Sequence, residues 1–146
     1  MGAKFDSAVA CEMALDKAVD SAMNGAVTER AVSIVQTVIE RTVYNSYEPK
    51  FLNRTYALMD RGNFITMYPY HDRNTLGIIP DADWNNIGFI RVDDSGTYDR
   101  LPEAIAFKNI YNAPPRDFYG KSEDELESQV GSLEKALTSA LHSMGF

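Results

Sequence analysis

The sequence predicts an α+β protein with a long N-terminal helix, a small antiparallel sheet in the middle and an amphipathic C-terminal helix. Residues 6–43 contain no proline and a single glycine, whereas the middle of the chain holds short, aromatic-rich runs that alternate with polar residues. Near the end, leucine and valine recur at steps of three and four. We therefore expect one α+β domain over residues 1–146, with helix in 6–43, strands and a long loop in 60–112, and helix in 122–144.

The N-terminal helix carries an apolar stripe along one face of its second half. The stripe follows the helical spacing: Val27, Ala31, Ile34, Val35, Val38, Ile39 and Val43. Gly25 separates it from a first half of smaller residues, so residues 6–43 form either one helix with a weak point at Gly25 or two helices joined by a turn there. A continuous helix would be about 57 Å long at 1.5 Å per residue. That length predicts either a fold-back at Gly25 or a partner subunit.

The middle of the chain is expected to supply the sheet. Residues 63–70, 88–93 and 104–111 are three short runs rich in aromatic and β-branched side chains. Residues 71–86 contain several turn-forming residues, so we expect a long loop or arm between the first two strands.

The C-terminal helix is expected to begin at a capping box, with Ser122 as N-cap and Glu125 three residues later. Its apolar positions then repeat at helical spacing: Leu126, Val130, Leu133, Leu137, Leu141 and Met144. Gly145 is expected to end the helix.

Composition excludes several classes of function. The net charge of −7 argues against a nucleic-acid-binding protein, which needs a basic surface, so we expect no sequence-specific nucleic-acid partner. No apolar run reaches the ~18–20 residues of a membrane span, and residues 1–6 lack the apolar segment of a signal peptide, so we expect no membrane association. The single cysteine, Cys11, cannot form an internal disulfide and is expected to be a small buried side chain.

No motif in the sequence predicts an enzyme. His71 and Asp72 invite a metal-hydrolase interpretation, but the other histidine, His142, lies on a separate predicted helix, and a histidine-based site needs more ligands. Asp81 and Asp83 lack the spacing of a calcium-binding EF-hand loop. We expect no catalytic activity, no metal and no cofactor.

The junction after the long helix is expected to be a structural corner. Pro49 cannot continue a helix, and the guanidinium group of Arg54 could hold backbone carbonyls or a carboxylate there. We assign the corner to Tyr44, Tyr47, Pro49 and Arg54.

The aromatic content of eight tyrosines, seven phenylalanines and one tryptophan suggests a protein interface as well as a core. Trp84, in a polar loop, is the best single interface candidate, although it fits a core position equally well. Tyr70 and His71 beside that loop, and Met13 in the small-residue half of the helix, complete the expected interface.

The junction resembles a pattern of small structural proteins of tailed bacteriophages, namely minor tail, tail-completion and head–tail joining proteins. The matching positions are Tyr44, Tyr47, Pro49, Arg54, Thr55, Leu58 and Asp60. A later Pro-Arg-x-Phe segment (Pro115, Arg116, Phe118) before the last helix fits the same plan, with Asp117 where a proline is often seen.

The resemblance implies a non-enzymatic virion protein that joins head and tail or completes the tail as part of a homo-oligomeric ring. Its partners would be other virion proteins: the connector, the tail tube or the tail terminator. It would be made in the cytoplasm of the bacterial host and reside in the virion.

A second hypothesis is a small acidic, phage-encoded inhibitor that imitates DNA and binds a host nucleic-acid enzyme. Such a mimic should gather its acidic residues on one face. Here they are interspersed with lysine and arginine along the chain, which favours the structural protein.

Overall fold

The computed structural model describes residues 4–46, 57–61, 64–67, 77–80, 89–91, 98–100, 105–107 and 115–146. Its helical elements are α1 (Ala8–Ala22), η1 (Met23–Val27, a π-helical segment), α2 (Thr28–Ile39), η2 (Glu40–Tyr44, also π-helical), η3 (Ala57–Met59, a 3₁₀ turn), α5 (Phe118–Ser128) and α6 (Val130–Ser143). Its strands are β1 (Phe64–Met67), β2 (Gly77–Pro80), β3 (Phe89–Arg91) and β4 (Tyr98–Arg100).

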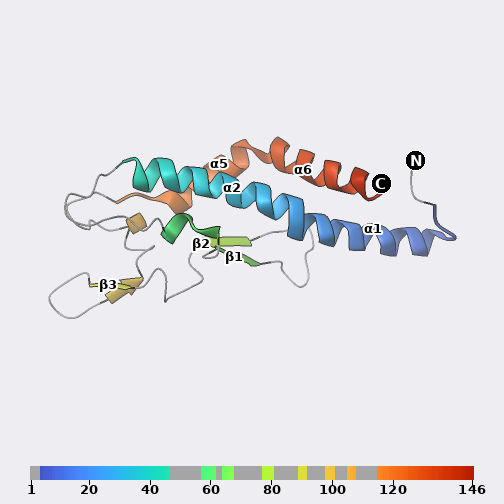
Figure 1. The fold of residues 1–146 in the computed structure, drawn as a ribbon, viewed down its shortest axis with the longest axis horizontal. Helices are drawn as coiled ribbons and strands as arrows, with labels where there is room; N and C mark the ends of the chain where they lie inside the picture. Colours follow the sequence, from blue (N-terminus) through green and yellow to red (C-terminus); the bar gives the residue numbers. More distant parts are fainter. Residues whose placement is uncertain are drawn as a thin grey trace.

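The first four helical elements form one continuous rod, so the helix does not turn back at Gly25 (Figure 1). Ser7 begins it as N-cap, because its hydroxyl oxygen accepts a hydrogen bond of 3.1 Å from the backbone N–H of Ala10. The stripe predicted from Val27 to Val43 is buried along its length, as expected. Cys11 is only half-buried, contrary to the expectation of a buried side chain.

Gly25 lies inside the π-helical segment η1, which accommodates one extra residue in the turn. Polar side chains bond carbonyls in this turn and just before it: the Thr28 hydroxyl donates to the carbonyl oxygen of Met23 at 2.6 Å, and the Asn24 amide donates to that of Asp20 in α1 at 3.0 Å. These bonds explain how the helix passes the glycine without breaking.

Gly25→Ala is expected to raise the free energy of unfolding by about 0.4–1 kcal/mol, because alanine restricts the unfolded chain and a Cβ at this helical position meets no atom within 4 Å. Chemical denaturation measures it. Gly131→Ala in α6, where a Cβ is equally free, should behave alike. Gly120→Ala is the contrast, since its Cβ would lie 2.6 Å from the Asp117 carboxylate. Destabilisation by Gly25→Ala would show that η1 requires glycine.

The C-terminal segment forms two helices, and the predicted cap at Ser122 is wrong. Asp117 is the N-cap of α5, with its carboxylate accepting a hydrogen bond of 3.0 Å from the backbone N–H of Gly120. Ser122 is buried inside α5. Burial of Phe118 against the rod extends the helix one turn upstream, and Asp117 is as good a cap as serine. At Gln129 the backbone (φ −107°, ψ 21°) leaves the helical region and separates α5 from α6.

The predicted α+β fold with a central antiparallel sheet is wrong, because the structure is mostly helical. Among the described residues, β1 pairs only with β2 and β3 only with β4, as two separate two-stranded hairpins. Each run pairs with the next strand along the chain instead of with the other predicted runs, and β2 lies within the predicted 71–86 loop. Residues 105–107 are helical, not extended, which agrees with the high helix propensity of alanine in that run.

The main core cluster lies where the C-terminal half of the rod meets the start of α5. It consists of Val35, Ile39, Val43, Leu58, Ala106 and Phe118. Phe118 and Ile39 are both 0% exposed. The cluster thus joins α2 and η2 to three segments that lie far along the chain.

Polar contacts at the end of the rod reinforce the cluster. The Gln36 amide donates to the carbonyl of Met59 at 2.7 Å, and the Tyr44 hydroxyl accepts from the backbone N–H of Leu58 at 3.2 Å. Arg116 donates to the carbonyl of Val43 at 3.4 Å, where the last carbonyls of a helix need partners. These bonds connect the helix end to η3 and to the segment before α5.

The C-terminal helices run back along the rod, with α5 beside α2 and α6 beside η1 and α1 (Figure 1). The ring of Phe5 stacks on that of Phe146, with centroids 5.7 Å apart. The rod and the C-terminal helices therefore contact each other at both ends, through the core cluster at one end and the Phe5–Phe146 pair at the other.

Candidate docking groove

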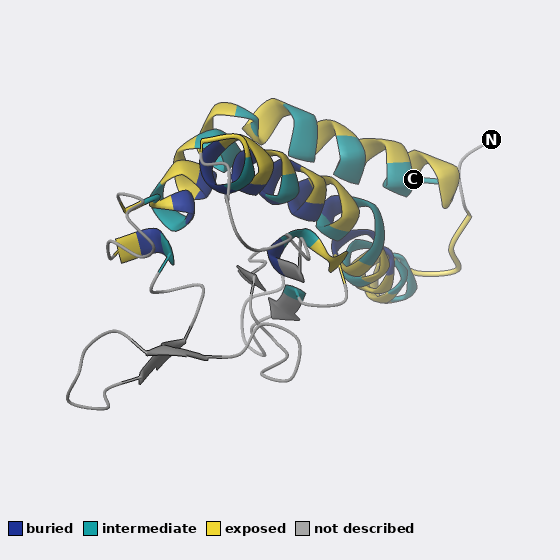
Figure 2. Cartoon of the chain, turned by 60° about the vertical axis from the view of Figure 1, so that its left-hand side comes forward, coloured by how far each residue is buried: buried dark blue, intermediate teal, exposed yellow. Residues whose placement is uncertain are grey.

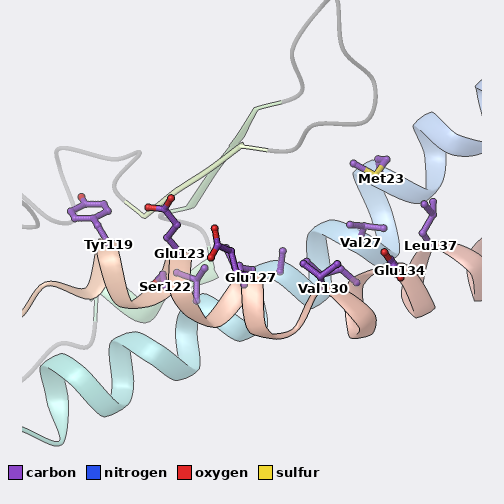
Figure 3. A pocket seen from close by; sticks show the side chains of 13 residues that line it. Met23, Val27, Tyr119, Ser122, Glu123, Glu127, Val130, Glu134 and Leu137 are labelled. Carbon is purple, nitrogen blue, oxygen red and sulfur yellow. The ribbon is translucent and has the colours of Figure 1, made fainter.

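A groove of about 510 Å³ runs between the rod and the C-terminal helices. Its walls come from η1 and α2 on one side and from α5 and α6 on the other. The lining residues are Met23, Val27, Ala31, Val35, Tyr119, Ser122, Glu123, Leu126, Glu127, Val130, Leu133, Glu134 and Leu137. Figure 3 shows the lining side chains on the rod and on α5 and α6.

The groove wall on the rod is a helical stripe at steps of four: Met23, Val27, Ala31 and Val35. The opposite wall continues the leucine and valine repeat of α5 and α6. Helix α6, which ends at the C-terminus, contains no fully buried residue (Figure 2). Its Val130 is 46% exposed. An amphipathic helix normally buries such a stripe, so the packing of α6 is incomplete on this side.

The groove carries charge of one sign. Glu123, Glu127 and Glu134 border it and all three are exposed, and none of the described residues that line it is a lysine or arginine. Ser122 also lines it, and its hydroxyl has no hydrogen-bond partner among the described residues. The site is an apolar channel with an acidic rim.

Polar contacts outside the groove link the rod to α5 and α6. Arg30 donates to the Ser132 hydroxyl at 2.7 Å and to the Gln129 side-chain carbonyl at 2.9 Å. Arg41 lies 3.6 Å from the Glu125 carboxylate. None of these residues lines the groove, so the helices are linked without closing it.

Few of the predicted site residues fall in the described part of the chain. Tyr47, Pro49, Arg54, Tyr70, His71 and Trp84 lie outside the described residues. Tyr44 is half-buried and holds the Leu58 backbone as given above, while Met13 is 67% exposed on α1. The corner and the interface therefore remain predictions.

Two residues to which the sequence gives no role of their own join the end of the rod to the start of α5. In the sequence, Arg116 and Phe118 stand out only as members of a Pro-Arg-x-Phe segment. Phe118 fills the core cluster, and Arg116 bonds the end of the rod. The sequence feature that indicates this role is an aromatic residue directly after Asp117, a residue type that often caps helices.

A second apolar surface lies on α1, where Val9 and Met13 are 66% and 67% exposed. They are four residues apart and so share one face of the helix.

Within the described ranges, no three histidine, cysteine, aspartate or glutamate side chains lie close enough to hold a metal ion. None of the described helices is long and apolar enough to cross a membrane.

These features define a mostly helical protein with apolar helix faces available for contact. The YomN family matches residues 9–143, and the chain belongs to this family. The family name is phage-derived, from an SPBeta-like prophage, which makes this a phage-related protein. No curated protein and no solved structure matches the chain.

Proposed function

We propose that this protein is a non-enzymatic structural component of a tailed-phage virion, joining head and tail or completing the tail as part of a homo-oligomeric ring. The observation that carries the proposal is the exposed apolar face of α1 in a member of a phage-derived family. The tail-protein resemblance of the 44–60 junction supports it further.

Ring formation needs two different surfaces that meet head to tail. The face defined by Val9 and Met13 supplies one of them, because exposed apolar side chains at adjacent turns gain free energy when a neighbour covers them. In this proposal its partners are other copies of the chain and, in the particle, the connector, tail tube or tail terminator.

Virions carrying this gene should contain the protein in a fixed ratio to the capsid protein, measured by quantitative mass spectrometry of purified particles. The double variant Val9→Asp with Met13→Asp should remain folded, since both positions are exposed. We expect it to yield unjoined heads and tails by electron microscopy, because two charges would have to be buried in the contact.

The matched control is Ser33→Asp with Thr37→Asp, which adds the same charges at two exposed positions four residues apart on α2. It should assemble normally. Absence of the protein from particles, together with binding to a host nuclease, would reject the virion role and favour the DNA-mimic inhibitor.

A further inference from the structure

We propose that the groove between the rod and helices α5 and α6 binds one amphipathic, basic helix of a partner protein. The occupant has an apolar face that enters the groove and lysine or arginine along its flank, paired with Glu123, Glu127 and Glu134. This goes beyond the virion role, which rests on α1.

The shape of the groove fits a helix. Its rod wall runs from Met23 to Val35, which corresponds to about 18 Å at 1.5 Å per residue, or about three turns of a bound helix. The rod wall forms the buried floor of the groove, since Met23, Val27, Ala31 and Val35 are only 3–7% exposed. The more accessible apolar side chains are those of α5 and α6, whose helical spacing suits contact with side chains at steps of three and four. On α6, such an occupant would cover Val130, which is 46% exposed in the free protein.

The charges select a basic helix. None of the described lining residues is a lysine or arginine, so basic side chains on the occupant would face the carboxylates of Glu123, Glu127 and Glu134. The three carboxylates lie on α5 and α6, on one wall of the groove. The occupant is therefore expected to carry its basic residues on one flank.

The same charges disfavour a second copy of this chain. The exposed apolar face of the protein lies on α1, and residues 4–22 hold four acidic and two basic side chains. Placing that helix against the acidic rim would bring like charges together.

The test uses the full-length protein and three fluorescent 14-residue helical peptides. The first has a leucine face and a lysine flank, the second has the same leucine face with a glutamate flank, and the third has the lysines but a scrambled leucine order. Fluorescence anisotropy should show saturable binding of the first peptide alone. The triple variant Glu123→Gln, Glu127→Gln and Glu134→Gln should weaken this binding about threefold or more at low salt, and added salt should remove the difference.

A matched pair of valines separates the groove from the rest of the surface. Val130→Lys puts a cation in the groove at a 46% exposed position and should weaken binding of the basic peptide by about tenfold. Val9→Lys makes the same change outside the groove and should leave it unaltered. If Val130→Lys lowers the melting temperature, the test uses the triple variant Glu123→Gln, Glu127→Gln and Glu134→Gln instead, because all three positions are exposed.

Equal binding of the acidic and basic peptides, or an equal loss in Val130→Lys and Val9→Lys, would overturn the proposal. So would a peptide-free dimer that Val130→Lys dissociates, which would make a second copy the occupant. Failure of all three peptides to bind would also overturn it. None of these results bears on the presence of the protein in virions, so the two proposals fail separately.

Discussion

Phe118→Ala is expected to lower the free energy of unfolding by about 3–5 kcal/mol, the cost of removing a buried aromatic ring. Phe118 is 0% exposed and packs in the cluster that joins the rod to α5. Its ring also contacts that of Tyr119, with centroids 4.4 Å apart. Alanine would leave a cavity that rigid helices on either side cannot fill.

Phe107→Ala is the matched control for this variant. Phe107 also stacks on Tyr119, with centroids 5.9 Å apart, but it is 58% exposed. Its replacement should cost about 1 kcal/mol or less, because little apolar area returns to water. Equal losses in the two variants, measured by urea denaturation, would contradict the location of the core.

Ile39→Ala is expected to cost about 2–5 kcal/mol, and Ile39→Val about 0.5–1.5 kcal/mol. Ile39 is 0% exposed at the end of α2, in the same cluster as Phe118. A cost that rises with the number of methyl groups removed is the signature of a closely packed site.

Val9→Ala is the control on the same rod. Val9 is exposed, so the free energy of unfolding of the Val9→Ala variant should differ from that of the wild type by less than about 0.5 kcal/mol.

Ile39 and Phe118 share neighbours in the core cluster, so the losses in the double variant Ile39→Ala with Phe118→Ala should not be additive. Purely additive losses would show that the two side chains pack in separate regions.

The helical part of the fold was largely predictable because it depends on local sequence. Residues 6–43 have no proline, and their apolar spacing specifies both the helix and its buried face. The passage through Gly25 was not predictable, since it depends on hydrogen bonds from Thr28 and Asn24 in a π-helical turn.

The predicted central sheet is wrong because short alternating runs indicate strands but do not specify which strands pair. The runs around Phe64 and Phe89 each pair with the next strand along the chain, so no common sheet forms among the described residues. In the same way, Ser122 and Asp117 are both suitable caps, and only the burial of Phe118 decides between them.

The groove could not be predicted from the sequence, since its walls lie about a hundred residues apart along the chain. The leucine repeat of residues 126–144 predicted an apolar face but not that this face would be partly uncovered. That outcome depends on how α5 and α6 pack on the rod, which the spacing of the repeat does not specify.

The π-helical segment η1 also sets the rotational phase between the two halves of the rod. A π-helical turn corresponds to one inserted residue, and an α-helix rotates about 100° per residue. Deleting one residue from Met23–Val27 would restore regular α-helix and swing α1 by about that angle relative to α2. The apolar face of Val9 and Met13 would then point in another direction, and Ala18 and Ala22, the buried residues of α1, would leave their present contacts, whereas the core cluster on α2 and η2 would stay intact. A length change of one residue would therefore redirect one contact surface of this protein and require α1 to repack.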